Sequence, residues 1–204
     1  ARELVDGGPI DVLTGDYLAE LTMAILYGQK IQRGDDKGYV GTFLKQIKEV
    51  AASCKEKNIK IVSNAGGLNP KSMATEIEKI LDELSIDLKV AYIDGDNLIP
   101  RISELKKNGE EFTNIEKNIS LDDSECEPLT ANAYLGAWGI KEALDNGADI
   151  VICPRVTDAA LVIGPAAWKF KWNRNDYDAL AGALAAGHII ECGCQATGGN
   201  YSFF

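Results

Sequence analysis

The stretch Asp149-Ile-Val-Ile-Cys-Pro-Arg-Val-Thr-Asp158 joins a buried strand to a charged turn, and it decides the fold. Residues 150–152 are all apolar and β-branched, which is typical of a strand buried on both faces of a parallel sheet. Pro154 ends the strand because proline has no N–H to donate to a neighbour. Arg155 and Asp158 then lie where open α/β sheets usually bind ligands. In the simpler interpretation, Asp158 caps a helix and Arg155 pairs with a neighbouring carboxylate.

Apolar runs alternate with helical periodicities along the rest of the chain. We expect short strands at 10–13, 59–62, 88–93 and 150–152. Strands that alternate with helices imply parallel pairing and right-handed crossovers. The sequence therefore predicts an α/β fold, specifically a three-layer α/β/α sandwich with a mainly parallel, Rossmann-like sheet. Part of a β/α barrel is the alternative, which periodicity does not separate from the sandwich.

The chain of 204 residues is long enough to bury a core, and we expect residues 1–204 to form a single α/β domain. Its most polar part, residues 108–130, is predicted to be an excursion from the core. A solvated loop is the simpler interpretation of this segment, and a lid-like loop is the alternative.

Composition excludes some classes of partner. The net charge of −10 disfavours binding to nucleic acid and to anionic membrane surfaces. No apolar run reaches the roughly 18 residues of a membrane span, and no signal peptide opens the chain. Five cysteines, an odd number, indicate reduced thiols rather than a disulfide framework. We therefore expect a cytoplasmic protein.

One helix is unusual because it has almost no polar face. It is predicted over residues 17–29, with Asp16 as its cap. A helix that is apolar all round is usually buried. Glu20 should then be paired, protonated or directed into a cavity, because burying an unpaired carboxylate is costly. Arg155 is the cation that the motifs place nearby, so we expect Glu20 within ion-pair or water-bridged reach of it, or lining the pocket beside it. The alternative is that Glu20 points outward through a gap in the packing.

Cap residues locate further helices. Asn69 followed by Pro70 is a favoured start of a helix. A helix over 179–186 should end at Gly187, and another is expected over 131–146.

Polar groups follow each of the four predicted strands. They are Asp16; Asn64 with Gly66 and Gly67; Asp94 with Asp96; and Arg155 with Thr157 and Asp158. Parallel strands end on one edge of a sheet, so we expect these residues to share a rim. Such a rim can bind a divalent metal, perform acid–base chemistry or cap helices. Mg²⁺ held by two of the aspartates is a candidate, but no neighbouring histidine supports it and no metal ligand is assigned.

The turn at 64–70 contains consecutive glycines ahead of a helix. Its backbone N–H groups and the helix dipole suit a carboxylate or phosphate. It matches neither the Walker pattern nor the dinucleotide fingerprint. The alternative is a tight turn that needs a positive φ angle.

The C-terminal stretch offers weaker candidates. His188, the only histidine, is a candidate for proton transfer. The spacing of His188, Cys192 and Cys194 does not match a zinc site. Asn200 lies in a glycine-rich stretch that is either a second anion-binding turn or an ordinary turn.

Four blocks of sequence resemble the acyclic terpene utilisation family, AtuA-like: residues 14–23, 63–70, 155–161 and 187–201. The resemblance implies a role in the breakdown of acyclic terpenes, such as citronellol and geraniol, through CoA thioesters. It implies a pathway rather than a reaction. It also implies a further strand before Ala1 and further residues after Phe204, so we expect the chain to be a fragment.

These observations favour an enzyme that acts on a carboxylate or acyl-CoA, of lyase, hydratase or hydrolase type. Arg155 would hold a carboxylate or phosphate in a bidentate manner, and Asp158 or Asp16 would transfer protons. The 64–67 backbone would stabilise an oxyanion. The candidate catalytic residues are Asp16, Glu20, Arg155, Asp158 and His188. The candidate substrate-binding residues are Asn64, Gly66, Gly67, Asn69, Asp94, Asp96, Thr157 and Asn200.

The alternative class is a non-catalytic binding or accessory subunit of an acyl-CoA-processing complex. The small-residue helix at 179–186 and the aromatic residues Trp168, Phe170 and Trp172 would form its interface. Placing the same aromatics in the core is the simpler interpretation. In either class we expect a homo-oligomer.

Overall fold

The computed structural model describes residues 1–124, 127–193 and 196. Four strands form one all-parallel sheet in the order β1-β2-β4-β3. They are β1 (Val12–Gly15), β2 (Lys60–Ser63), β3 (Val90–Tyr92) and β4 (Ile150–Ile152). Within the described ranges the sheet is open, with β1 and β3 at its edges. The predicted parallel, Rossmann-like sheet is confirmed, and the barrel alternative is not supported.

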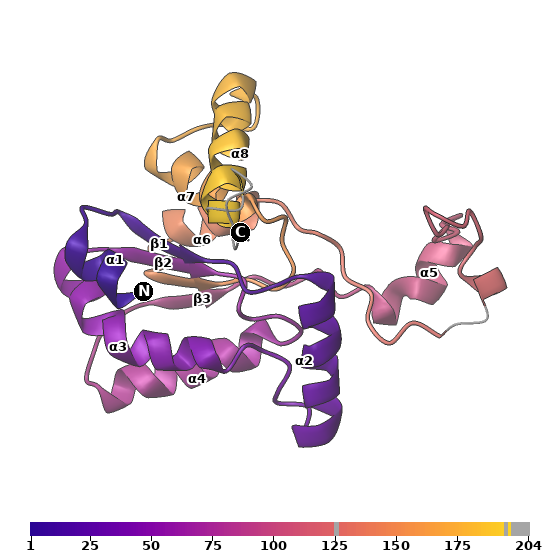
Figure 1. Ribbon diagram of the computed structural model, residues 1–204, viewed down its shortest axis with the longest axis horizontal. Helices are drawn as coiled ribbons and strands as arrows, with labels where there is room; N and C mark the ends of the chain where they lie inside the picture. The colour runs from indigo at the N-terminus through magenta and orange to yellow at the C-terminus, as the bar shows by residue number, and fades with distance from the viewer. Residues whose placement is uncertain (125–126, 194–195, 197–204) are drawn as a thin grey trace, which may run out of the picture.

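Helices cover both faces of the sheet (Figure 1). One layer holds α1 (Arg2–Gly7), α3 (Thr42–Lys57) and α4 (Pro70–Glu83). The other holds α6 (Trp138–Asp145), α7 (Ala160–Lys169) and α8 (Tyr177–Cys192), and α8 packs on α7. The result is the predicted three-layer sandwich.

The central strand β4 separates two hydrophobic clusters. Ile150 and Ile152 pack in the cluster that includes residues of α3 and α4. Val151 packs in the cluster that includes residues of α6 and α7. All three side chains are fully buried, so the prediction of a strand buried on both faces is confirmed.

The prediction of a buried helix over 17–29 is wrong. The helix α2 spans Glu20–Arg33 and stands across the end of the sheet (Figure 1). Only Met23 and Leu26 are buried in it, whereas Leu21 is 72% exposed. Asp16 does not cap the helix, because its Oδ1 accepts the Leu18 N–H at 3.1 Å in the preceding turn. The prediction failed because an apolar composition does not show whether another element covers a helix. In the described chain, no other layer covers α2.

Two other helix boundaries also differ from expectation. The helix α6 begins at Trp138, because residues 131–135 instead pair with extended chain, Asn132 with Asn97 and Leu135 with Val156. The helix α8 continues past Gly187 to Cys192. Gly187 is a site of close packing: a β-carbon there would lie 2.9 Å from the Ala159 Cβ.

Residues 97–124 and 127–132, called the arm below, extend away from the sheet (Figure 1). The arm contains η1 (Ile99–Arg101), α5 (Ile102–Lys107) and η2 (Asp122–Ser124). Backbone hydrogen bonds close its base: Leu98 N donates to Ala131 O at 2.7 Å, and Ala133 N donates to Asp96 O at 2.7 Å. Every described residue of the arm is at least partly exposed, including those of the predicted excursion at 108–130.

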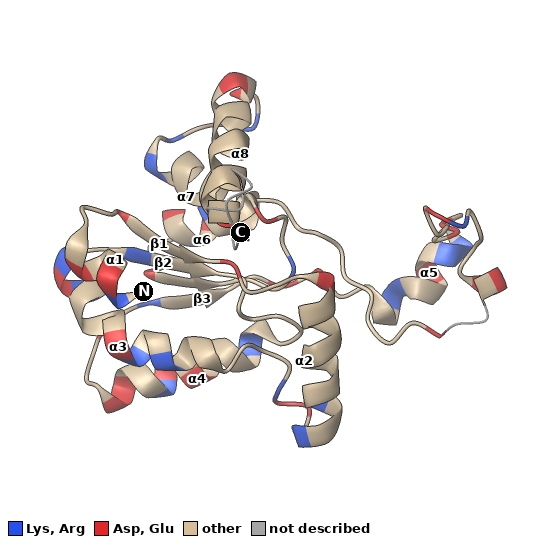
Figure 2. Ribbon diagram, viewed as in Figure 1, with Lys and Arg blue, Asp and Glu red and all other residues tan. Residues whose placement is uncertain are grey.

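Charge is distributed unevenly over the helices (Figure 2). The outward sides of α3 and α4 carry both signs, whereas α8 is almost free of charge along most of its length. None of the described helices is both long and apolar enough to cross a membrane.

Candidate functional site

The ends of β1 and β2 are joined by a buried amide. Asn64 is fully buried, and its Nδ2 donates to Asp16 Oδ1 at 2.6 Å. Its Oδ1 accepts the Tyr17 N–H at 2.8 Å. Both functions of the amide are therefore engaged, so Asn64 orients Asp16 and is not available to contact a ligand.

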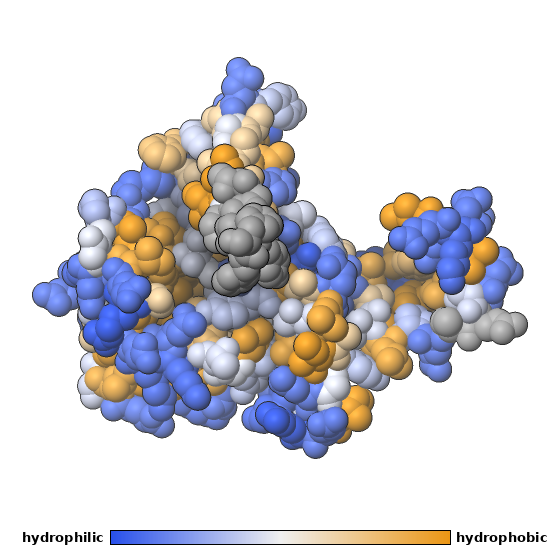
Figure 3. All heavy atoms as spheres, viewed as in Figure 1, coloured by the Kyte–Doolittle hydropathy of each residue, from blue (hydrophilic) through white to orange (hydrophobic). Residues whose placement is uncertain are grey.

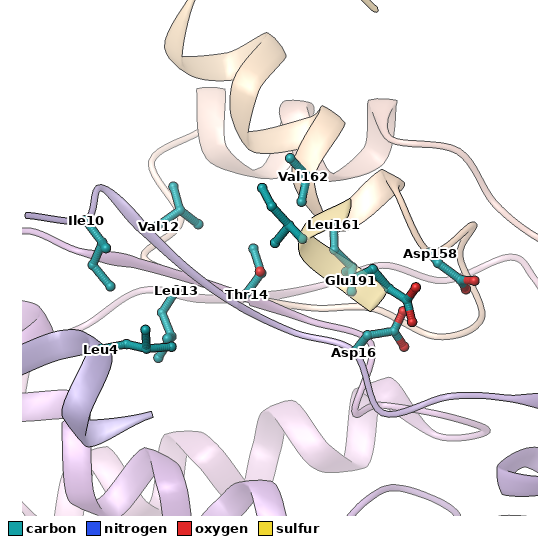
Figure 4. A pocket seen from close by; sticks show the side chains of 11 residues that line it. Leu4, Ile10, Val12, Leu13, Thr14, Asp16, Asp158, Leu161, Val162 and Glu191 are labelled. Atoms are coloured by element: carbon teal, nitrogen blue, oxygen red, sulfur yellow. The ribbon is translucent and has the colours of Figure 1, made fainter. Parts of the chain in front are cut away.

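Three carboxylates converge near the end of β1 (Figure 4). Oxygen atoms of Asp16, Asp158 and Glu191 lie within 4.8 Å of one another. They come from the turn after β1, the turn before α7 and the last turn of α8. We call them the acidic cluster. Sequence reasoning identified Asp16 and Asp158 but missed Glu191, because the helix was expected to end at Gly187.

Asp16 has the most perturbed environment in the acidic cluster. Burial raises the pKa of its carboxyl above the ordinary value of 3.8, and the charges of Asp158 and Glu191 add to the rise. Hydrogen bonds from Asn64 and Leu18 oppose this rise in pKa only in part. Among the described residues the buried Oδ2 has no hydrogen-bond partner. A proton on Oδ2 would remove the charge repulsion and could then be donated.

A cavity of about 570 Å³ opens beside the acidic cluster. Figure 4 shows the carboxylates at one end and aliphatic side chains along the rest. Its apolar lining comes from α1, β1 and its approach, α7 and α8, and consists of Leu4, Ile10, Val12, Leu13, Leu161, Val162 and Ile190. An apolar pocket with a few converging polar groups is the usual form of a small-molecule site.

The acidic cluster could hold a divalent cation. Carboxylate oxygens are the ligands that Mg²⁺ and Ca²⁺ prefer, and the unpaired Asp16 Oδ2 fits such a ligand. A proton on Asp16 Oδ2 would reduce the repulsion between the carboxylates in the same way as a bound cation. The geometry therefore supports either proton transfer or cation binding by these side chains.

Arg155 lies behind the acidic cluster and is 4% exposed. Its Nη1 donates to Leu18 O at 3.0 Å and to Asp158 Oδ1 at 3.2 Å. Its Nη2 lies 3.8 Å from Glu20 Oε1, which confirms the expected approach of these two residues. Because two carboxylates and a carbonyl already engage the guanidinium, the geometry favours a positioning role for Arg155 over bidentate binding of a ligand.

Glu20 reaches Arg155 from the surface. Its side chain is 80% exposed, so the expectation of a buried carboxylate is wrong although the pairing is correct. The Tyr134 hydroxyl donates to Glu20 Oε1 and is the main cause of the lowered pKa of that carboxyl. Sequence reasoning missed Tyr134, whose ring lies 4.1 Å from the Arg155 guanidinium carbon.

The glycine turn after β2 is a packing element and not an open anion site. Three of its N–H groups are used internally: Ala65 N donates to Ser63 Oγ, Gly67 N to Asn64 O and Leu68 N to Gly38 O. A β-carbon at Gly66 would lie 2.6 Å from Cys153 O. Gly67 has φ +53°, and a β-carbon there would lie 2.4 Å from Leu26 Cδ1. Both glycines are therefore explained by close packing and backbone conformation.

The two aspartates after β3 have different environments. Asp94 is exposed, and its Oδ1 accepts the Gly95 N–H at 2.7 Å. Asp96 is buried, and its Oδ2 accepts Asn132 Nδ2 at 2.7 Å and Arg155 N at 3.3 Å. Burial raises the pKa of the Asp96 carboxyl. Asp96 thus fastens the base of the arm to the turn after β4, and neither residue lines the cavity.

Asn69 and Thr157 also serve the framework. Asn69 Oδ1 accepts the Ser72 N–H and caps α4 as predicted, while its Nδ2 donates to Asp35 O at 2.9 Å. Thr157 is exposed, and its N–H donates to Leu135 O at 2.9 Å.

The remaining C-terminal candidates are not brought to the acidic cluster. His188 is exposed on α8 and does not line the cavity. Asn200 and Cys194 lie outside the described residues. The Cys192 thiol donates to Glu191 Oε2 at 3.0 Å, and this hydrogen bond raises the pKa of the thiol, which disfavours a nucleophilic role.

Fold and site together define an α/β protein with an apolar cavity that ends in a carboxylate cluster, at the carboxyl edge of a parallel sheet. Comparison with protein families identifies the family to which this chain belongs. The chain belongs to the family described as "Acyclic terpene utilisation family protein AtuA", whose profile matches residues 1–204. This membership connects the chain with the utilisation of acyclic terpenes. Searches of curated proteins and of solved structures give no match.

Proposed function

We propose that this chain forms the substrate site of an enzyme that acts on the thioester of a branched, acyclic acyl chain. The observation that carries the proposal is the position of the acidic cluster at one end of the apolar cavity. The aliphatic lining suits a hydrocarbon chain, since burying each methylene group contributes about 0.8 kcal/mol. Membership of the acyclic terpene utilisation family supports a chain of this kind.

The charge of the site favours a thioester over a free acid. No lysine or arginine is among the described residues that line the cavity, whereas Asp16, Asp158 and Glu191 are. Even with Asp16 protonated, a free carboxylate would be repelled by the carboxylates of Asp158 and Glu191, and an uncharged thioester carbonyl would not.

Acid–base chemistry is the reaction type that these residues support best. In a hydration, the water oxygen would bond to one carbon of an activated double bond. The Asp158 carboxylate would take a proton from that water molecule. Protonated Asp16, whose pKa is raised, would donate a proton to the other carbon. The reverse reaction is a lyase step.

Turnover of geranoyl-CoA, monitored by loss of the conjugated thioester absorbance, tests this proposal. Asp16→Asn should reduce kcat by at least about a hundredfold, in keeping with the loss of a general acid. Asp178→Asn, the same chemical change at an exposed position of α8, should leave kcat unchanged. Equal activity of the two variants would refute the assignment of Asp16, and absence of turnover by the unmodified protein would refute the reaction.

Two exposed apolar helices support a second proposal, self-association. On α8, Ile189 is 62% exposed and Leu184 is also exposed, and α2 exposes Leu21 and Ile25. Figure 3 shows hydrophobic side chains at the surface over α2. Exposed apolar area of this kind marks an interaction site. Phe170 is likewise exposed and stacks on Trp172 with 5.5 Å between ring centroids, so it is not a core residue.

Light scattering after size exclusion tests the association. The unmodified chain should elute as an oligomer, and Ile189→Glu should lower its mass to that of a monomer. Ile115→Glu, a change of the same kind on the arm, is the control. A monomeric unmodified chain would refute self-association and would leave the accessory-subunit alternative dependent on a different partner.

A further inference from the structure

Arg155 supports the acidic cluster from behind, and its own position is fixed by two residues outside the cluster. The guanidinium donates to Asp158 Oδ1 at 3.2 Å and to Leu18 O at 3.0 Å, both through Nη1. Nε is buried and has no hydrogen-bond partner among the described residues. These hydrogen bonds come from one nitrogen, so the rest of the guanidinium is held by the groups on its face and at Nη2.

Tyr134 and Glu20 occupy those positions. The Tyr134 ring lies over the guanidinium, 4.1 Å from ring centroid to Cζ, in a cation–π contact. Glu20 Oε1 lies 3.8 Å from Nη2 and accepts the Tyr134 hydroxyl hydrogen. Both residues are exposed, so they form the outer wall that separates the Arg155 side chain from solvent.

The position of Tyr134 is itself fixed by the backbone on its C-terminal side. Leu135 N donates to Arg155 O at 3.2 Å, and Thr157 N donates to Leu135 O at 2.9 Å. On its N-terminal side, Asn132 is held by Asp96, which also accepts the Arg155 N–H. Tyr134 is therefore anchored to the same turn that carries Arg155 and Asp158.

We propose that Tyr134 is a positioning residue for the acidic cluster: its ring and hydroxyl hold the Arg155 guanidinium in the orientation that fixes the Asp158 carboxylate. This inference deepens the proposed function and rests on it for its effect on turnover. In the contacts described above, Tyr134 contacts Arg155 and Glu20, and Arg155 in turn contacts the cavity-lining Asp158. Tyr134 therefore acts on the reaction indirectly.

The test has one readout that needs no substrate. Guanidinium ¹⁵N–¹³C spectra, assigned with Arg155→Lys, report rotation about the Cζ–Nε bond. The unmodified protein should give separate Nη signals for Arg155, because its guanidinium is held. Tyr134→Leu should merge them, whereas Tyr134→Phe, which keeps the ring, should preserve part of the separation. Separate signals in folded Tyr134→Leu would overturn the proposal.

The second readout is kinetic and uses geranoyl-CoA. Tyr134→Leu should lower kcat about tenfold with KM little changed, and Tyr134→Phe should recover most of the loss. A purely structural role would lower stability but leave kcat of the folded fraction unaltered, and that result would overturn the proposal. If the unmodified protein shows no turnover, the proposed function fails while the spectra still decide whether Tyr134 positions Arg155. If Tyr134→Leu does not fold, Glu20→Gln replaces it, because that change weakens the contact at Nη2 from an exposed position.

Discussion

The amide of Asn64 donates to the Asp16 carboxylate at 2.6 Å, and this hydrogen bond joins the ends of two adjacent parallel strands beneath the acidic cluster. Removing the amide should be costly because its carbonyl also accepts the Tyr17 N–H. We expect Asn64→Ala to lower the free energy of unfolding by about 2–3 kcal/mol, since buried groups lose their partners. Urea denaturation measures this. Asn173→Ala, at an exposed asparagine, should cost less than about 0.5 kcal/mol, and equal costs would contradict the role of Asn64.

The raised pKa of Asp16 predicts a pH-dependent stability. A folded-state pKa above the ordinary value of 3.8 means that the unfolded state releases the proton first as pH rises. Stability is therefore lost between that ordinary value and the raised pKa, and the loss persists at neutral pH. Asp16→Asn removes the titration and keeps an oxygen that can accept from Asn64. The variant should melt at a higher temperature than the unmodified protein at pH 7, and the difference should shrink toward pH 3. A difference in melting temperature that is constant across this range would contradict the burial of the charge.

Two glycines on α8 should respond in opposite directions to alanine. A β-carbon at Gly187 would lie 2.9 Å from the Ala159 Cβ and 3.2 Å from Ala159 O, so the helices must move apart. Gly182 has no atom within 4 Å of such a β-carbon. We expect Gly187→Ala to destabilise by about 1–3 kcal/mol through overpacking. Gly182→Ala should stabilise by up to about 1 kcal/mol through helix propensity. If both variants are stabilised, Gly187 does not lie in a close contact.

Local patterns were sufficient to predict much of the fold. The β-branched run at 150–152 and the Asn69–Pro70 helix start depend on residues adjacent in sequence, and both are confirmed. The convergence of Asp16, Asn64 and Arg155 at one edge followed from parallel pairing alone.

The predictions that were wrong depend on tertiary contacts between residues distant in sequence. Periodicity shows that α2 is apolar but not whether another element covers it. Consecutive glycines indicate either an anion-binding turn or close packing, and only the positions of Cys153 O and Leu26 Cδ1 distinguish these. Glu191 and Tyr134 follow no strand, so no rule about strand ends could select them. A signal for Glu191 did exist, because it is the only acidic residue in α8 after Asp178.

The apolar cavity beside the acidic cluster should bind the acyl chain, and calorimetric titration with geranoyl-CoA measures this binding. Val162→Trp places a large side chain in the cavity, whereas Ala185→Trp adds the same side chain at an exposed position of α8. We expect Val162→Trp to weaken binding at least tenfold, about 1.4 kcal/mol, and Ala185→Trp to bind as the unmodified protein does. Unchanged affinity in a folded Val162→Trp variant would show that the acyl chain does not bind in this cavity.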